Sequence, residues 1–299
     1  MTFDVLVVGG SFAGLSAAMQ LARARRPVCV VDAGAPRNRF AEASHGFFAQ
    51  DGVPPFELLE QARGKLRAYP SVTFVDAFAT SARADGGGFV LGLDGHAPLR
   101  ARKLVLAHGV RDVLPEIGGL AERWGRTVLH CPYCHGYEVA GRTLGVLSTS
   151  PMSAHHAALV ADWGPVTLLL DGPDTLSDED RALLRRRNVA VATGRVVALE
   201  GDAPALTAAV LDNGRRVPLE ALFIGPRTVP ASPLADQLGC AFDEGMAGSA
   251  IRVDEMKQTT VPGVFAAGDA ARGMHNATFA SADGVMAGVA AHRSLVFDL

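Results

Sequence analysis

The sequence predicts an α/β protein with two Rossmann-like dinucleotide-binding domains, each a three-layer ββα unit, the second inserted into the first. Residues 3–32 have the pattern of a strand, a glycine turn, a helix and a second strand. The same order of elements returns in residues 144–172. A third segment, "TTVPGVFAAGDAARG" near the C-terminus, is an apolar strand that ends in Gly and Asp, which suits the second half of a split first domain.

Composition fits two medium-sized domains rather than a disordered chain. The chain has 299 residues, of which 48% are hydrophobic and 20% charged, and its formal net charge is −3. That charge leaves no basic surface for a phosphate backbone. No apolar run reaches the roughly 20 residues of a membrane span, and no signal-peptide pattern precedes the first strand. We therefore expect a cytoplasmic protein that binds neither nucleic acid nor a membrane.

Four residues of the first unit carry the pattern of a dinucleotide site. Gly9 allows a tight turn after the first strand, and Gly14 allows the following helix to pack closely on that strand. The first amides and the dipole of this helix can then hold a pyrophosphate. Ser11 stands where the fingerprint has its middle glycine. Asp32, at the end of the second strand, is placed to accept hydrogen bonds from ribose hydroxyls.

Other segments complete the first domain. Between Phe74 and Leu99, short strands broken by "ADGGG" and "LDGHAP" predict a β-meander. The strand "RKLVLAHG" ends at Gly109, and the C-terminal strand ends at Gly268 and Asp269, whose carboxylate can hold a cofactor hydroxyl. A last helix with Ala and Gly at packing spacing follows. Two remote parts of the chain are therefore expected to build one cofactor site.

The second unit keeps the elements but not the glycines. When the acidic residues that end the two second strands are aligned, the three fingerprint positions fall on Ser148, Ser150 and Ser153. Each serine adds a side chain where a dinucleotide phosphate needs bare backbone. Asp171 would repel the 2′-phosphate of NADPH, although it is the residue type that suits NADH. The sequence thus predicts a second dinucleotide-type unit that keeps the fold but has lost the binding fingerprint.

The segment "HCPYCHGYE" holds two cysteines three positions apart, followed by a histidine. Redox pairs, zinc sites and c-type haem attachment share this pattern. Haem attachment needs export, and structural zinc needs four ligands, whereas the chain has no second Cys-x-x-Cys pair, so we expect no metal. We interpret Cys131 and Cys134 as a redox pair, and Cys29 and Cys240 as inert packing thiols.

The residues around the pair favour a thiolate, which is the form of cysteine that attacks a disulfide. Pro132 suits the first position of a helix, which places Cys131 at the N-cap, where the helix dipole stabilises a negative sulfur. His130 and His135 offer adjacent protons or positive charge, and His135 is the candidate general base. The alternative is that His135 only caps the helix.

The motifs "VVGGSFAG", "CPYCHGYE" and "TTVPGVFAAGD", with the Ala/Gly-rich last helix, resemble the low-molecular-weight thioredoxin reductases over nearly the whole chain. The resemblance implies an FAD-binding domain in residues 1–112 and 242–299, and an inserted nicotinamide-type domain in residues 113–241. His135 replaces the usual Asp after the second cysteine, and "CPYCHG" is most similar to the small-molecule dithiol oxidases of the gliotoxin and holomycin type. In that branch the NADPH site is commonly degenerate.

The resemblance implies an FAD-dependent thiol-disulfide oxidoreductase that oxidises a dithiol to its disulfide with oxygen or another acceptor. Cys134 would face the flavin, Cys131 would exchange with the substrate, and His135 would act as the base. The alternatives are a thioredoxin reductase that uses NADPH, NADH or ferredoxin, and a flavin-binding carrier without catalysis. The expected partners are a small-molecule dithiol or a thioredoxin-like protein, and a second copy of the chain in a homodimer.

The same resemblance implies which residues contact FAD. They are Gly9, Ser11, Phe12, Ala13, Gly14, Asp32, Ala33, Arg37, Asn38, His45, Ala79, Gly109, Gly268, Asp269, His275, Asn276 and Ala277. His45 and His275 fall where family members approach the flavin ring. For these two histidines, cofactor contact and structural filling are both open.

Overall fold

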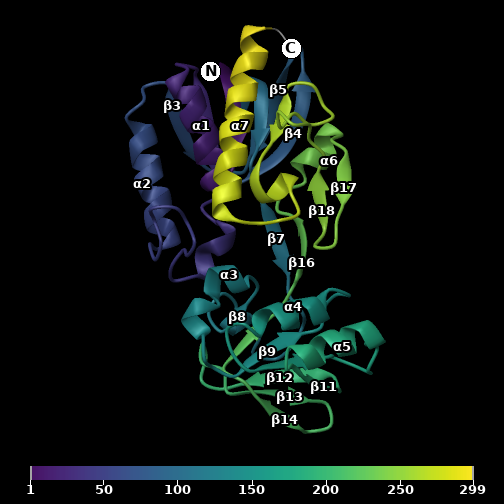
Figure 1. The fold of residues 1–299 in the computed structure, drawn as a ribbon. Helices are drawn as coiled ribbons and strands as arrows, with labels where there is room; N and C mark the ends of the chain where they lie inside the picture. The colour runs from purple at the N-terminus through teal and green to yellow at the C-terminus, as the bar shows by residue number, and fades with distance from the viewer. Residues whose placement is uncertain (1, 298–299) are drawn as a thin grey trace.

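The computed structural model describes residues 2–297, which form two units joined by a pair of antiparallel strands (Figure 1). The larger unit contains both ends of the described chain, and the smaller unit is inserted between them. The connecting strands are β7 (Val110–Val113) and β16 (Arg227–Pro230). The predicted α/β class with an inserted second unit is confirmed.

A seven-stranded sheet forms the centre of the larger unit, in the order β3-β2-β1-β6-β5-β4 with β19 paired to β6. The strands are β1 (Thr2–Val8), β2 (Val28–Asp32), β3 (Val72–Asp76), β4 (Ala79–Asp85), β5 (Gly88–Leu93), β6 (His96–Leu106) and β19 (Val264–Ala266). The end of β6 runs parallel to β1 and β19, whereas its start is antiparallel to β5. The predicted meander is therefore present, but it begins at β4, because β3 pairs in parallel with β2.

Two cores lie on the two faces of this sheet. Val5 and Val7 of β1 pack on one face, and Leu6 and Val8 pack on the other, because side chains alternate along a strand. Three helices cover the first face: α1 (Phe12–Arg23), α2 (Pro55–Arg67) and α7 (Ala277–Val296). The meander closes the second face. The sheet is thus buried on both sides, which explains its continuous apolar strands.

Helices α1 and α7 touch through their backbones. A Cβ atom at Gly284 would lie 2.1 Å from the carbonyl oxygen of Ala13, and one at Gly288 would lie 2.6 Å from that of Ala17. Neither distance leaves room for a side chain, so the Gly spacing seen in the sequence is what lets the helices meet. The contact at Ala13 fixes the first turn of α1, where the candidate site begins.

The smaller unit contains a parallel sheet in the order β11-β10-β9-β15-β8 and an antiparallel sheet in the order β12-β13-β14. Its strands are β8 (Val128–Leu129), β9 (Leu144–Leu147), β10 (Val166–Leu169), β11 (Ala190–Ala192), β12 (Val196–Glu200), β13 (Ala208–Leu211), β14 (Arg216–Pro218) and β15 (Ala221–Phe223). Its helices are α3 (Pro132–His135), α4 (Ser153–Val160) and α5 (Asp178–Arg186), with short turns η2 (Ala121–Arg123) and η3 (Tyr137–Val139). The predicted second strand-helix-strand unit is β9-α4-β10.

The chain returns to the larger unit earlier than the expected boundary at residue 241. Helix α6 (Leu234–Leu238) follows β16, and Leu234 and Cys240 lie in the core of the larger unit. The Gln237 side chain also accepts a hydrogen bond from the Ala82 amide of β4 at 2.9 Å. Because the apolar residues of α6 pack on the meander, we place the return of the chain to the larger unit at β16. The hairpin β17 (Phe242–Glu244) and β18 (Ser249–Ile251) comes next.

No helix within residues 2–297 has both the length and the apolar character that crossing a membrane requires.

We expect Gly284→Ala to lower the free energy of unfolding by about 2 kcal/mol, because the added Cβ would overpack the contact with α1. Denaturant unfolding measures the change. The matched control is Gly64→Ala in α2, where a Cβ would meet nothing within 4 Å. That change should stabilise the protein by about 0.8 kcal/mol, because Ala has the higher helix propensity. A Gly284→Ala protein as stable as the wild type would contradict the close packing of α1 and α7.

Candidate active site

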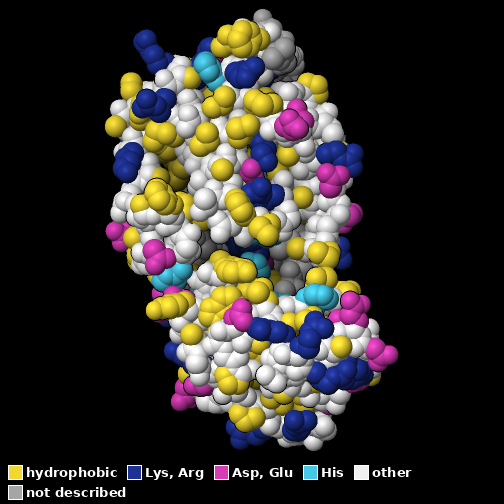
Figure 2. All heavy atoms as spheres, in the orientation of Figure 1, with side chains coloured by type: hydrophobic (Ala, Val, Ile, Leu, Met, Phe, Trp, Pro, Cys, Tyr) yellow, Lys and Arg dark blue, Asp and Glu magenta, His cyan; other side chains and the backbone are white. Residues whose placement is uncertain are grey.

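A cavity of about 640 Å³ lies between the larger unit and α3 of the smaller unit. This volume is in the range of cofactor and small-molecule sites. Its walls come from the start of α1, the end of β2, the turn η1 (Arg37–Phe40), the segment after β6, the turn η4 (Gly268–Ala271) and the start of α7. The space-filling view shows the surface hollowed where the two units meet (Figure 2).

Nearly all the residues predicted to form a site line this cavity. They are Gly9, Ser11, Phe12, Ala13, Asp32, Ala33, Arg37, Asn38, His45, Ala79, Gly109, Cys131, Cys134, His135, Gly268, Asp269, His275, Asn276 and Ala277. The one predicted residue that does not line it is Gly14. A Cβ there would lie 1.8 Å from the Gly9 carbonyl oxygen, so Gly14 is needed for packing α1 on β1.

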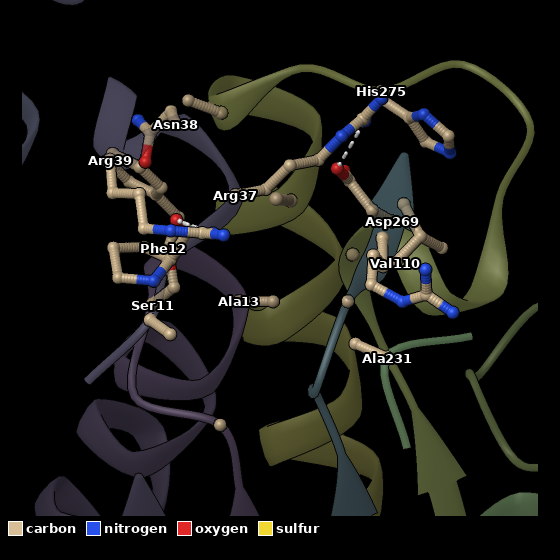
Figure 3. Close-up of a pocket in the computed structure, with 18 of the residues that line it drawn as sticks. Ser11, Phe12, Ala13, Arg37, Asn38, Arg39, Val110, Ala231, Asp269 and His275 are labelled. Carbon is tan, nitrogen blue, oxygen red and sulfur yellow. Dashed lines mark hydrogen bonds and ion pairs between the residues drawn. The ribbon is translucent and has the colours of Figure 1, made fainter. Parts of the chain in front are cut away.

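The glycine loop before α1 is tightly packed and leads into the first turn of the helix, where Ser11, Phe12 and Ala13 lie on the cavity wall (Figure 3). A Cβ at Gly9 would lie 2.3 Å from the Ala107 carbonyl oxygen, and one at Gly10 would lie 2.5 Å from the carboxylate of Asp32. Ser11 is the N-cap of α1, and its side chain makes no capping hydrogen bond. The helix N-terminus therefore presents backbone amides to the cavity, which suits an anion such as a pyrophosphate.

Arg37 joins two carboxylates at the cavity wall. Its Nε donates to Asp112 at 2.9 Å and its Nη1 donates to Asp269 at 3.0 Å (Figure 3 shows the second pair). Burial acts to lower the pKa of Arg37, but the hydrogen bonds and charges of the two carboxylates outweigh it, so the pKa is raised. Because Asp112 belongs to the connecting strand β7, Arg37 ties the cofactor side of the cavity to the link between the units.

Cys131 and Cys134 form a disulfide in the cavity wall, with a Cα–Cα distance of 5.3 Å. Cys131 is the N-cap of α3 and Pro132 is its first residue, as the sequence predicts. The Cys131 sulfur accepts a hydrogen bond from the Cys134 amide at 3.2 Å. After reduction of the pair, this amide would stabilise a thiolate at Cys131. Within residues 2–297, no cluster of His, Cys, Asp or Glu has the arrangement of a metal site.

The histidine behind the pair is held neutral by its surroundings. Burial lowers the pKa of His135, the charge of Glu138 partly opposes this, and His45 adds to it. His45 lies between the units, with Nε2 3.4 Å from Glu138 and Nδ1 3.6 Å from Asp51. A neutral His135 imidazole can accept a proton at pH 7, which a general base must do. His45 bridges the two units as well as lining the cavity.

His130 does not supply positive charge to the cysteines, contrary to the sequence-based expectation. Burial, and then the charge of Arg37, lower the pKa of His130 to about 3. The imidazole is therefore neutral across the physiological pH range. Burial also lowers the pKa of His275, whose Nε2 lies 3.1 Å from the Arg272 carbonyl oxygen. The stabilisation of a Cys131 thiolate thus comes from the Cys134 amide and the helix start.

Residues 3–284 match the family described as pyridine nucleotide-disulphide oxidoreductase. The chain belongs to this family. It is 31% identical to thioredoxin reductase tcpT of Claviceps purpurea, over 99% of this chain and 95% of that protein. The crystal structure of an oxidoreductase from Agrobacterium tumefaciens is 46% identical, with a TM-score of 0.95 and full coverage of both chains. The crystal structure of HlmI is 38% identical, with a TM-score of 0.93 over 99% of this chain and 93% of that one.

The expected resemblance to thioredoxin reductases is confirmed, and the chain is a disulfide oxidoreductase of that type. In this pyridine nucleotide-disulphide oxidoreductase, a serine of the second strand-helix-strand unit binds amides of its own loop. The hydroxyl of Ser153 accepts hydrogen bonds from the amides of Thr149 and Ser150 at 3.0 and 3.1 Å. The Asp171 carboxylate accepts from the Val196 amide at 2.8 Å.

Sequence reasoning missed other cavity residues, among them His108 and Asp112. His108 comes directly before Gly109, and its Nε2 is buried without a partner among the described residues, while its Nδ1 lies 3.1 Å from the Gly109 carbonyl oxygen. The sequence feature that could have marked His108 is its position at the end of the apolar strand "RKLVLAHG". Asp112 pairs with a residue 75 positions away, so no local pattern marks it.

Acid should destabilise the protein partly through His108. Burial lowers the pKa of this histidine from 6.5 to about 4. Between these values the unfolded chain binds the proton and the folded protein does not, so stability falls as the pH falls. The shift corresponds to a loss of about 3 kcal/mol between pH 7 and pH 4.

We expect His108→Gln to reduce the fall in unfolding free energy between pH 7 and pH 4.5, measured by denaturant titration. Part of the fall should persist, because buried His130 acts in the same direction. An equal fall in the variant and the wild type would contradict the neutral, buried state of His108.

Proposed function

We propose that the chain is an FAD-dependent dithiol oxidase, in which a dithiol substrate reduces the Cys131–Cys134 disulfide and leaves as a disulfide. The observation that carries this proposal is a contrast between two nucleotide motifs. The α1 start in the cavity has no side-chain cap, although the Gly10 amide of its loop binds Asp32, whereas the Ser153 hydroxyl of the second motif accepts from the amides of both Thr149 and Ser150. Bound FAD would accept the electron pair of the enzyme dithiol and pass it to oxygen or another acceptor.

Three features of the cavity fit FAD. The start of α1 suits the pyrophosphate. The carboxylates of Asp32 and Asp269 lie at strand ends on the cavity wall, where they can accept hydrogen bonds from cofactor hydroxyls. His108 Nε2 is a buried nitrogen without a protein partner in residues 2–297, and such atoms are normally completed by a ligand or by water. The predicted FAD residues that line the cavity are therefore the proposed contacts.

Disulfide exchange accounts for the substrate half of the reaction. A substrate thiolate attacks one sulfur of the enzyme disulfide, forms a mixed disulfide and releases the other cysteine as a thiolate. The second substrate sulfur then attacks the mixed disulfide, so the substrate leaves oxidised and the enzyme holds the dithiol. The family resemblance gives Cys131 the exchange with substrate and places Cys134 toward the flavin. The hydrogen bond from the Cys134 amide supports the first of these roles, because it favours a thiolate at Cys131.

His135 is the proposed proton acceptor for this exchange. It follows Cys134 directly and lines the cavity, and burial keeps its imidazole neutral at pH 7. It can therefore take the proton of the attacking thiol and return it at a later step. The Glu138 charge favours the protonated form of His135, so the imidazole can both accept a proton and return it.

Loss of the NADPH site is part of the proposal. A dinucleotide in the second unit would need the amides that the Ser153 hydroxyl occupies, and the added side chain stands where a phosphate would approach. The Asp171 carboxylate accepts from the Val196 amide, and its negative charge would repel the 2′-phosphate of NADPH. Electrons would then enter from the dithiol rather than from a nicotinamide.

The second candidate is a thioredoxin reductase fed by NADPH, NADH or ferredoxin. The retained β9-α4-β10 unit and the name of the relative tcpT favour it. The proposed partner is accordingly a small-molecule dithiol, with a thioredoxin-like protein as the alternative. A homodimer and a cytoplasmic location stay predictions.

The proposal predicts which reductant reduces the flavin. Anaerobic stopped-flow mixing of the purified flavoprotein with dithiothreitol should bleach the flavin absorbance, and admission of air should restore it. NADPH and NADH should cause no rapid bleaching. Bleaching by either nucleotide within milliseconds would instead support the reductase, and a protein that can be neither isolated nor reconstituted with flavin would overturn both. Cys131→Ser and Cys134→Ser should each abolish the reaction with dithiol.

We expect His135→Ala to keep bound FAD but to slow dithiol-dependent flavin reduction by about 100-fold, the lower end of general base effects. The acid limb of the wild-type pH–rate profile should lie below the ordinary histidine pKa of 6.5, because burial lowers the pKa of His135. That limb should vanish in the variant. His155→Ala, on the exposed side of α4, is the control and should behave as wild type. An unchanged profile in His135→Ala would favour a role in capping the helix.

A further inference from the structure

Arg63 of helix α2 lies behind the proposed ribose-binding carboxylate. It is only 8% exposed, although it is a charged residue. Its Nη1 donates to Asp32 at 2.6 Å, and its Nη2 donates to Asp76 at 2.7 Å. The guanidinium also lies 5.0 Å from the ring centroid of Phe74. Neither the proposed reaction nor the sequence patterns account for this buried cation.

The two carboxylates occupy matched positions at the ends of neighbouring strands. Asp32 ends β2, Asp76 ends β3, and the two are paired in the parallel register. Like charges at such positions repel each other. Arg63 offsets this repulsion with one donor to each carboxylate, but Asp76 is exposed whereas the Asp32 side chain is largely buried. The stronger of the two contacts is therefore the one to Asp32, because it is less screened by water.

Arg63 and a backbone amide together fix the Asp32 carboxylate. Oδ2 accepts from Arg63, while Oδ1 accepts from the Gly10 amide at 3.0 Å. Each carboxylate oxygen can accept a second hydrogen bond, so both still have capacity for a donor in the cavity. Asp32 lines the cavity and Arg63 does not. Arg63 therefore acts on a cavity ligand only through Asp32.

We propose that Arg63 is a positioning residue, which holds the Asp32 carboxylate in the orientation that receives the ribose hydroxyls of the adenosine half of FAD. It also offsets the Asp32 charge next to Gly10, where a bare carboxylate would repel the pyrophosphate. This inference rests on the proposed binding of FAD in this cavity. Arg63 is expected to change the affinity for FAD, because it touches neither the disulfide nor the cavity.

The test measures the dissociation constant of FAD from the apoprotein by quenching of flavin fluorescence. Arg63→Met keeps the apolar stem over Phe74 but removes both donors, and it should weaken FAD binding about tenfold, the effect of losing one charge-assisted hydrogen-bond partner. Arg63→Lys should restore part of the affinity, because one ammonium group can reach one carboxylate. The matched control is Arg67→Met, one turn further along α2, where the guanidinium is 5.6 Å from the same Phe74 ring and the side chain is 55% exposed. The control should bind FAD as the wild type does.

A second readout separates positioning from a purely structural role. An FAD analogue that lacks the 2′-hydroxyl of the adenosine ribose should bind more weakly than FAD to the wild type. In Arg63→Met this difference should shrink, because the carboxylate is no longer held for that hydroxyl. A variant that merely loosened α2 would unfold more easily without FAD but would keep the wild-type preference for FAD over the analogue. That result would overturn the inference.

The outcomes also separate this inference from the proposed function. A wild-type apoprotein that binds no FAD would overturn the proposed function and the inference with it. FAD binding of equal affinity in the wild type and in Arg63→Met would overturn the inference alone. If Arg63→Met does not fold, Arg63→Lys replaces it. Its affinity should then lie below that of wild type, with a reduced preference for FAD over the analogue, and wild-type values for both would overturn the inference.

Discussion

The packing of α1 between β1 and α7 is the constraint on which the candidate site depends. Gly14 lets the helix rest on the Gly9 carbonyl, and Gly284 lets α7 approach the Ala13 carbonyl. Both contacts act on the first turn of α1. They bring residues from the start of the chain beside Gly268 and the start of α7 on one cavity wall. A dinucleotide cradle assembled from such distant segments needs this backbone contact, because side chains at these positions would force the layers apart.

The two strand-helix-strand units show how little sequence change separates an open phosphate cradle from a closed one. In the first unit the N-cap serine leaves the amides of α1 directed at the cavity. In the second unit the hydroxyl of Ser153 accepts hydrogen bonds from two backbone amides of the same loop. The strands and the helix stay in place in both units, because their apolar contacts do not depend on the loop. A domain can thus keep its architecture after its loop has stopped offering a site.

Local pattern was sufficient to predict the class of fold, both strand-helix-strand units and the Cys131 N-cap. It also marked the glycine turns and strand-end carboxylates of the cavity wall, whereas most of the other predicted cavity residues were implied by the family resemblance. Pairings between distant residues were not predictable in this way. Arg37 meets Asp112 only after the chain has built four further strands, β3 to β6, and α6 joins the larger core because its apolar face fits the meander. The neutral state of His130 depends on its burial and on the charge of Arg37, a residue of the other unit, which no short segment specifies.

The two remaining cysteines of the chain differ from the reactive pair in their surroundings. Cys29 lies in β2 with no exposed surface, and burial raises its pKa to about 12. Cys240 is also buried, and its pKa is raised chiefly for the same reason. Both stay protonated and out of reach while disulfides are made and broken at the cavity. In the proposed dithiol oxidase, these two thiols are thereby kept from exchanging with the substrate or with the redox pair.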